Sequence, residues 1–103
     1  MDISVRRVGD ATVVAAAGEL DLEVADTLRG RLNEVIVSGP DRLVVDLSGA
    51  TFIDSTILGV LVGTRNQLGG GELHVVAAHP AVLKIFQMTG LDQVFRISPT
   101  LPA

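Results

Sequence analysis

Apolar and polar positions divide the first part of the chain into two short β-like runs and one helix-like stretch. Residues 3–8 and 12–17 are rich in β-forming residues and flank the turn sequence Gly9-Asp10, which predicts an antiparallel hairpin. From about residue 24 to residue 36, apolar side chains recur at helical spacing. The Gly39-Pro40 pair that follows is typical of a helix end, so we expect one helix between two strand regions.

The next part of the chain repeats the alternation of strand and helix. Residues 43–47 and 73–77 are nearly continuous apolar runs, typical of strands buried on both faces of a sheet. Between them, a loop over residues 48–53 leads to a strongly apolar helix over 57–68. The three glycines at 69–71 follow this helix rather than opening one, so we expect a flexible turn and not a phosphate-binding loop.

A last helix and a last strand complete the pattern. Pro80 suits the first turn of a helix, and Gly90 followed by Leu91 is typical of a helix end with its apolar contact. Residues 95–97 are a possible strand, and residues 98–103 are expected to form a loose tail behind a core that spans about residues 3–97. The order ββαβαβαβ predicts an α/β fold with a mixed, mostly parallel sheet, an N-terminal antiparallel hairpin and flanking helices.

Composition narrows the class of protein. A chain of 103 residues that is 48% apolar is long enough for one domain with its own core, and the absence of cysteine excludes disulfides and thiolate metal sites. A net charge of −4 disfavours nucleic acid as a direct partner. No apolar run reaches the roughly 18 residues of a membrane span, and the first residues do not resemble a signal peptide. We therefore expect a cytoplasmic domain without a membrane partner, cofactor or metal.

Three other polar residues are candidates for chemistry, but we expect structural or surface roles for them. His74 falls in a predicted strand and His79 precedes a proline; neither has a second histidine at helical spacing, so no metal site is indicated. Asp46, inside an apolar strand, could be a phosphoacceptor like that of receiver domains. That chemistry also needs an acidic pair after the first strand and a late lysine, whereas the only lysine, Lys84, falls in a helix.

The triplet Asp54-Ser55-Thr56 is the most informative polar site. Any of the three side chains can cap a helix by accepting a backbone N–H bond, and capping alone is one explanation of the triplet. If Asp54 or Ser55 is the cap, the Ser55 hydroxyl lies exposed at the positive end of a helix dipole, where a phosphate is stabilised. A phosphate there would add about −1.5 to −2 charges beside Asp54. The site is therefore predicted to be a phosphorylation switch.

The helix after this triplet is apolar almost all round. We expect one face, with Leu58, Leu61, Val62 and Leu68, to meet the sheet. The opposite face would then be partly exposed and open to close approach of a protein partner; its members are Ile57, Gly59, Val60 and Gly63. The alternative is a helix buried on all sides.

Five segments together resemble the STAS domain family, with bacterial anti-sigma factor antagonists as the closest likeness. The resemblance covers residues 3–97 in order, and the whole chain, 1–103, is expected to be one such domain. The segments are Gly18-Glu19-Leu20-Asp21, Val45-Asp46-Leu47, Phe52-Ile53-Asp54-Ser55-Thr56, Leu58-Gly59-Val60 and Met88-Thr89-Gly90-Leu91.

The resemblance implies a regulatory protein rather than an enzyme. The unphosphorylated antagonist binds an anti-sigma factor that is itself a serine kinase, which frees a sigma factor. The kinase phosphorylates the serine that matches Ser55, and a serine phosphatase reverses this step. The resemblance also implies that Glu19 and Asp21 contact the partner, beside Asp54, Ser55 and Thr56.

One residue departs from the family pattern. The motif usually continues with glycine where this chain has Ile57, next to the expected docking surface. The branched side chain is compatible with altered partner specificity or with slow or absent phosphorylation. An alternative function is therefore a STAS scaffold or sensor module that binds partners or a small ligand without a phosphorylation cycle. A small α/β enzyme is a third hypothesis, for which the sequence offers no base or metal-ligand set.

Overall fold

The fold is a six-stranded mixed sheet in a computed structural model that describes residues 2–69 and 72–101. The strands β1 and β2 form the predicted antiparallel hairpin, and β2, β3, β5 and β6 run parallel in the order β1-β2-β3-β5-β6. This confirms the predicted fold class. The strands are β1 (Asp2–Val8), β2 (Ala11–Leu20), β3 (Arg42–Asp46), β4 (Ala50–Ile53), β5 (Leu73–Val76) and β6 (Arg96–Ser98).

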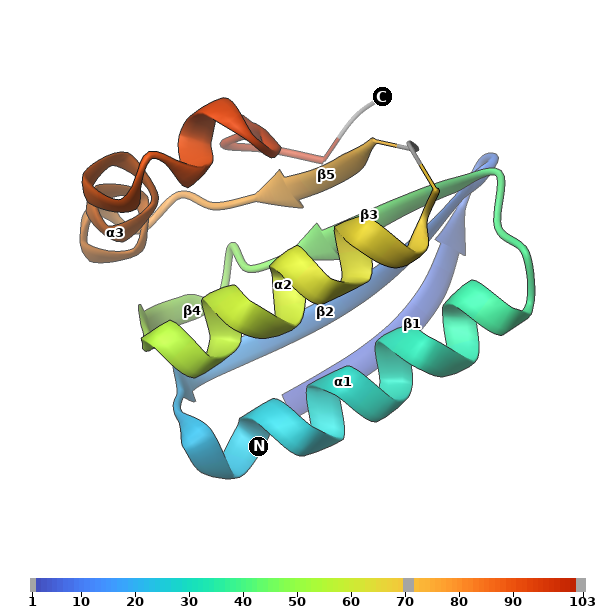
Figure 1. Cartoon of the computed structure of the whole chain (residues 1–103), viewed down its shortest axis with the longest axis horizontal. Helices are drawn as coiled ribbons and strands as arrows, with labels where there is room; N and C mark the ends of the chain where they lie inside the picture. Colours follow the sequence, from blue (N-terminus) through green and yellow to red (C-terminus); the bar gives the residue numbers. More distant parts are fainter. Residues whose placement is uncertain (1, 70–71, 102–103) are drawn as a thin grey trace.

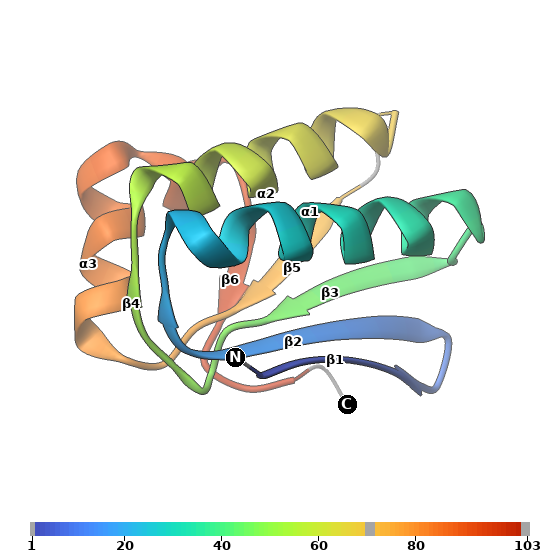
Figure 2. The same ribbon diagram turned by 90° about the horizontal axis from the view of Figure 1, so that it is seen from below.

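Two long helices, α1 (Leu22–Val37) and α2 (Ser55–Gln67), lie side by side on one face of the sheet (Figure 1). Figure 2 shows the same two helices as a layer above the strands. The third helix, α3 (Pro80–Thr89), packs at one end of the molecule against β4 and is followed by a short 3-10 turn, η1 (Leu91–Gln93). No helix in the described part of the chain is long and apolar enough to cross a membrane.

The short strand β4 was not predicted from the sequence, because the segment 48–53 was expected to be a loop. Only four residues long, β4 buries its two ends, Ala50 and Ile53, and exposes the two residues between them. It pairs with the far end of β2, and the register of this pairing shifts between Gly18 and Glu19. Gly18 has a φ of +91°, which suits glycine. Pairing with a distant segment, rather than a local pattern, makes this segment a strand.

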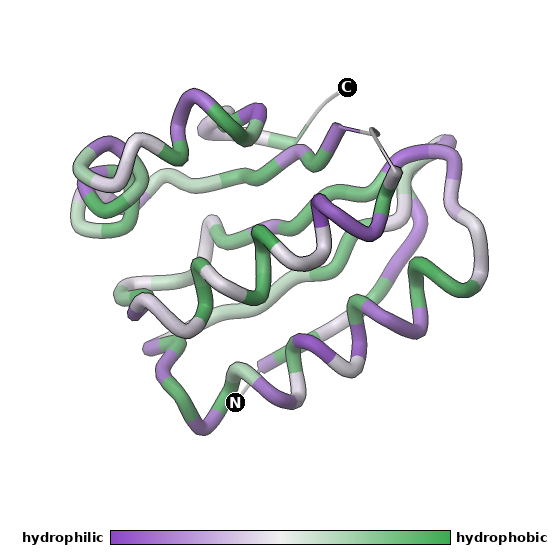
Figure 3. The backbone as a smooth tube through the Cα atoms, in the orientation of Figure 1, coloured by the Kyte–Doolittle hydropathy of each residue, from purple (hydrophilic) through white to green (hydrophobic). Residues whose placement is uncertain are grey.

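The main apolar core lies between the sheet and α1 and α2. Figure 3 shows α1 with alternating hydrophilic and hydrophobic segments, whereas α2 is hydrophobic over much of its length. Val14, Leu28, Val45, Leu61 and Val75, from five different elements, are all buried in this core. Burial of such side chains stabilises the fold by about 1.5–3 kcal/mol each.

A smaller apolar cluster on the opposite face of the sheet is partly covered by the end of the chain. Ala11, Val13, Val44 and Val76 form this cluster, and Leu101 packs against it. The expectation of a loose tail over 98–103 is therefore wrong for part of that segment, since Ser98 also belongs to β6. Residues 102 and 103 lie outside the described residues.

The ends of α3 confirm two local predictions: Pro80 lies in its first turn, and Gly90 ends it in the left-handed conformation with φ of +75°. Two caps were not predicted: Asp21 caps α1 and His79 caps α3. Gly69, the first residue of the turn predicted after α2, has a φ of +62°, which suits a glycine turn. Gly70 and Gly71, the rest of the predicted turn, lie outside the described residues.

Candidate functional site

The amino ends of α1 and α2 lie at the same end of the molecule (Figure 1). This follows from the topology, because β2 and β4 run parallel and each leads directly into its helix. The carboxyl ends of parallel strands meet at one edge of a sheet, which is where α/β folds usually place their functional groups. The topology therefore places Glu19 and Asp21 at the same end of the molecule as Ser55 and its neighbours.

Asp54 is the residue that caps α2. It has extended backbone angles (φ −109°, ψ 179°), and its side-chain Oδ1 accepts hydrogen bonds from the backbone N–H groups of Thr56 at 3.0 Å and Ile57 at 3.2 Å. Its carbonyl oxygen accepts the first bond of the helix, from the N–H of Leu58 at 3.3 Å. Of the caps that the sequence allowed, the structure selects Asp54, which leaves the Ser55 side chain out of that role.

Ser55 is the first residue of α2, and its side chain is exposed. Its hydroxyl group thus lies at the positive end of a helix dipole, one residue from the Asp54 carboxylate. Thr56, the neighbouring hydroxyl residue, is only half-exposed. The more accessible of the two hydroxyl residues is therefore Ser55.

The expected exposure of Ile57 and Val60 is wrong. Ile57 has 0% and Val60 3% of its surface exposed, and both belong to the main core. The reason is that α2 packs against α1 as well as over the sheet, so its buried arc is wider than one face. Neither side chain can contact a partner in this conformation, and the Ile57 side chain does not occupy the surface beside Ser55.

The surface of α2 next to Ser55 consists instead of small residues. Gly59, one turn along the helix, is exposed, and Gly63 is half-buried. Apart from the adjoining residues and the backbone of the helix itself, a Cβ added to either glycine would meet no described atom within 4 Å. The α2 backbone is therefore open to close approach at these two positions. The prediction of an exposed face thus fits the glycines, whereas its two apolar members, Ile57 and Val60, are buried.

The segment between β2 and α1 brings acidic side chains to the same end. Glu19 and Asp21 are exposed, and Asp21 Oδ1 accepts a hydrogen bond from the Glu23 N–H at 3.1 Å. Leu22 and Phe52 are also exposed at this end of the molecule, although they are large and apolar. Hydropathy alone assigns such residues to a core, so their exposure could not be predicted from the sequence.

His74, His79 and Asp46, the other polar candidates from the sequence, form contacts within the fold. His74 is buried on β5, and its Nε2 lies 2.6 Å from Ser98 Oγ; His79 Nδ1 accepts the cap bond from the Ala81 N–H at 3.1 Å. Asp46 is buried at the end of β3 and accepts a bond from the Ser48 N–H at 2.9 Å. Within the described ranges, no group of three or more His, Asp or Glu side chains could hold a metal ion.

The fold and this polar end define a small α/β domain with exposed groups where two helices begin. Residues 2–103 match the STAS domain family, and the chain belongs to that family. The sequence is 34% identical over 90 residues to the anti-sigma-F factor antagonist RsfB of Mycobacterium tuberculosis, a match that covers 86% of this chain and 74% of the relative. It is 32% identical over 100 residues to the anti-sigma-B factor antagonist of Bacillus subtilis, covering 95% and 91% of the two chains.

A solved structure supports the same assignment. The crystal structure of an anti-sigma factor antagonist from Mycobacterium paratuberculosis has a TM-score of 0.90 and 34% sequence identity with this chain. The match covers 97% of this chain and 86% of that one. The family and the fold expected from the sequence are thus confirmed, whereas the roles of individual residues stay predictions.

Proposed function

We propose that this protein is an anti-sigma factor antagonist that binds an anti-sigma factor serine kinase while Ser55 is unphosphorylated. Binding frees a sigma factor, and phosphorylation of Ser55 by the kinase ends the complex until a serine phosphatase removes the phosphate. The observation that carries this proposal is the exposed Ser55 side chain on the first residue of α2, directly after its Asp54 cap. The names of the two relatives and of the solved structure support the antagonist role.

The chemical step at Ser55 is a phosphoryl transfer. The Ser55 Oγ attacks the γ-phosphorus of ATP, the bond to the β-phosphate oxygen breaks, and ADP leaves; the serine proton passes to a base on the kinase. This chain's histidines have other contacts, since His74 lies against Ser98 and His79 caps α3. The base and the metal ion therefore come from the kinase.

Electrostatics explains how the phosphate would act as a switch. The helix dipole of α2 stabilises a phosphate on Ser55, so the modified state is tolerated by the fold. The added charge of about −1.5 to −2 lies beside Asp54, at an end of the molecule that also carries Glu19 and Asp21. A partner surface that fits the unmodified site would be repelled by this charge, or would have to remove water from the phosphate without offering it a compensating contact.

The alternative of a module without a phosphorylation cycle depended on Ile57 beside Ser55. Because the Ile57 side chain is buried in the core, it does not alter the surface that a kinase would meet. No other described feature favours that alternative over the switch.

Phosphorylation tests the proposal directly. The purified anti-sigma factor kinases encoded in the source genome are incubated with this protein and ATP, and intact mass is measured. One phosphoryl group is expected on the wild type and on Thr56→Ala, and none on Ser55→Ala. Phosphate retained by Ser55→Ala would show that the site assignment is wrong.

Binding tests the consequence of the modification. Ser55→Glu should weaken binding to the same kinase, whereas Thr27→Glu, which adds a charge on the exposed side of α1, should not. If none of the kinases binds the wild-type protein, the antagonist function is refuted.

A further inference from the structure

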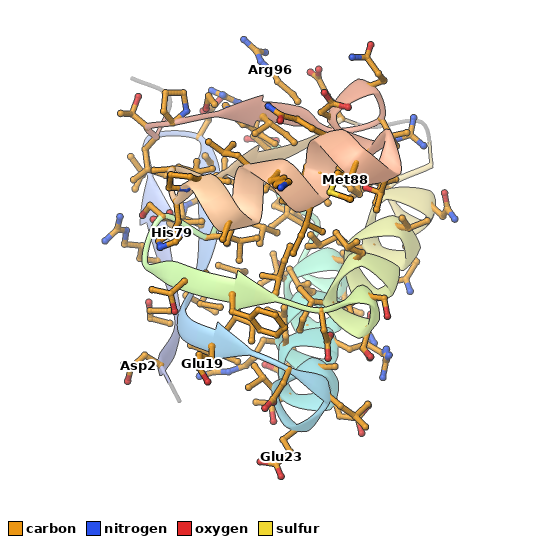
Figure 4. All side chains as sticks on the ribbon, turned by 90° about the vertical axis from the view of Figure 1, so that its left-hand side faces the viewer. Asp2, Glu19, Glu23, His79, Met88 and Arg96 are labelled. Atoms are coloured by element: carbon orange, nitrogen blue, oxygen red, sulfur yellow. The ribbon has the colours of Figure 1, made fainter. Side chains whose placement is uncertain are left out.

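A small hollow lies where β3, β5 and β6 begin, at the opposite end of the parallel strands from Ser55. It is lined by Arg42 and Arg96, the first residues of β3 and β6, and by His74, the second residue of β5. Figure 4 shows Arg96 on the opposite side of the molecule from Glu23, near the start of α1. The hollow measures about 250 Å³, less than the roughly 300–1,000 Å³ of pockets for drug-sized ligands, so its size suits a small molecule.

His74 brings a ring nitrogen without a hydrogen-bond partner to this hollow. The residue is only 8% exposed, and its Nε2 lies 2.6 Å from the Oγ of Ser98, which does not line the hollow. Because Ser98 Oγ donates to the Thr100 carbonyl oxygen, it accepts from Nε2–H, and Nδ1 is an unprotonated acceptor. The two nitrogens point to different sides of the ring, so Nδ1 faces away from Ser98, and no described group donates to it. A ligand that donates to Nδ1 would satisfy this buried acceptor.

The charged side chains around this ring are weakly paired. Arg96 Nη1 lies 3.8 Å from Glu72 Oε2, too far for a hydrogen bond, and both side chains are more than half exposed. Arg42 donates at 3.3 Å to Asp10, which lies outside the hollow. Burial lowers the pKa of His74, and Arg96 and Arg42 lower it further, whereas Glu72 acts in the opposite direction. Charges of both signs therefore lie within electrostatic reach of the ring.

This combination of groups fits a zwitterion better than a simple anion or cation. Two arginines line the hollow, and so do two carboxylates, those of Asp41 and Glu72, so its charges balance. A guanidinium binds a carboxylate through two parallel hydrogen bonds, whereas an ammonium has donors for a carboxylate and for an imidazole nitrogen. Apolar surface comes from Pro40, Leu43 and Leu68. An α-amino acid with an apolar side chain carries all three complementary groups on one small molecule.

We propose that this hollow binds a free α-amino acid with an apolar side chain. The ligand carboxylate draws Arg96, whose side chain is 63% exposed, away from Glu72. The ligand ammonium then donates to the Glu72 carboxylate and to Nδ1 of His74, while the ligand side chain packs against Leu43 and Leu68. One weak ion pair is thus exchanged for two closer ones, at the two ends of the ligand. This site is independent of the proposed function, because it lies at the other end of the strands from Ser55.

The class of ligand is tested by NMR titration of the isotope-labelled protein alone. The probes are leucine, valine and methionine, together with isocaproate and isopentylamine, which match leucine but lack its ammonium and its carboxylate, respectively. At least one amino acid should saturably shift the amide signals of residues 42, 74 and 96. Leucine should bind about tenfold more tightly than either analogue, because each analogue loses a charged hydrogen bond.

Three results would overturn the proposal. The first is no saturable shift with any of the three amino acids at millimolar concentration, and the second is shifts confined to residues outside the hollow. The third is an analogue that binds as tightly as leucine, which would make the hollow a site for simple anions or cations. None of these results bears on binding of the anti-sigma factor kinase, since no kinase is present in the titration.

Variants of the lining residues test the contacts. Arg96→Gln and Glu72→Gln should each weaken binding of the tightest amino acid by about tenfold, since each removes one charged partner. Arg31→Gln and Glu23→Gln, matched changes at exposed residues of α1 outside the hollow, should bind like the wild type. Thermal unfolding verifies that each variant is folded. Wild-type affinity in either lining variant would show that the amino acid does not bind as proposed.

Discussion

Residues near the start of α2 differ sharply in their surroundings. Ser55 is exposed, Ile57 is fully buried two positions later, and Gly59 is exposed again. Each residue turns the helix by about 100°, so alternate side chains point to different sides. The effects of substitution at these positions should therefore be separable into effects on stability and effects on the surface.

Replacing Ile57 by glycine should destabilise this protein. The variant loses a buried side chain, worth about 2–5 kcal/mol, and places glycine in a helix at a further cost of about 1 kcal/mol. Urea unfolding measures the free energy of unfolding. A loss below about 1 kcal/mol would contradict the buried position of Ile57.

Gly59→Ala is the matched control on the same helix. Its added methyl group meets open space, and alanine favours the helix, so stability should rise by about 0.5–1 kcal/mol.

The buried imidazole of His74 responds to its neighbours. Ser98 Oγ lies 2.9 Å from the Thr100 carbonyl oxygen and donates to it, so Oγ accepts from His74 Nε2–H. His74 Nδ1 is then an unprotonated nitrogen, buried without a partner among the described residues. Burial, followed by the positive charges of Arg96 and Arg42, lowers the pKa of His74 from its usual 6.5, although Glu72 acts in the opposite direction.

Stability should therefore fall as the pH drops below about 6.5. In that range the unfolded chain binds a proton on His74 that the folded protein binds less well, so acid favours unfolding. Wild type should lose more free energy of unfolding between neutral and mildly acidic pH than His74→Gln. Equal losses, or a ring titration by NMR with a midpoint above 6.5, would contradict the structure.

At the scale of elements, the ends of α2 and α3 were predictable from the sequence, but the short strand β4 was not. Capping by Asp54 and the end of α3 at Gly90 depend on local residue types, which are visible in the sequence. The strand β4 exists because it pairs with β2, and Ile57 is buried because α1 and the sheet both pack against α2. Such contacts between distant segments leave no local pattern, so the exposed and buried sides of α2 were partly misassigned.

The cap of α2 gives a prediction at this scale. Asp54→Ala removes the acceptor for two backbone N–H groups and should lower the free energy of unfolding by about 1 kcal/mol. Asp54→Asn keeps an acceptor at the same position and should change stability little. Chemical denaturation of the two variants checks this difference; equal stabilities would mean that the cap bonds do not form in solution.

At the scale of the whole molecule, the candidate site around Ser55 and the His74 site belong to different parts of the fold. The candidate site lies where β2 and β4 end and α1 and α2 begin. His74 lies on β5, which pairs with β3 on one side and β6 on the other. Substitutions at His74 should thus report on stability without altering the candidate site.

The pairing of β2 also determines which part of the molecule opens last. Residues 11–15 of this strand pair with β1 on one side and β3 on the other, whereas its last residues, Gly18–Leu20, pair with β4. The amide protons of residues 11–15 thus have a paired strand on either side of them. Their exchange with deuterated water should therefore require unfolding of the whole domain. Faster exchange is expected in β6, which is three residues long. Exchange measured by NMR should find the slowest amides in the first half of β2, so this strand marks the most persistent unit of the fold.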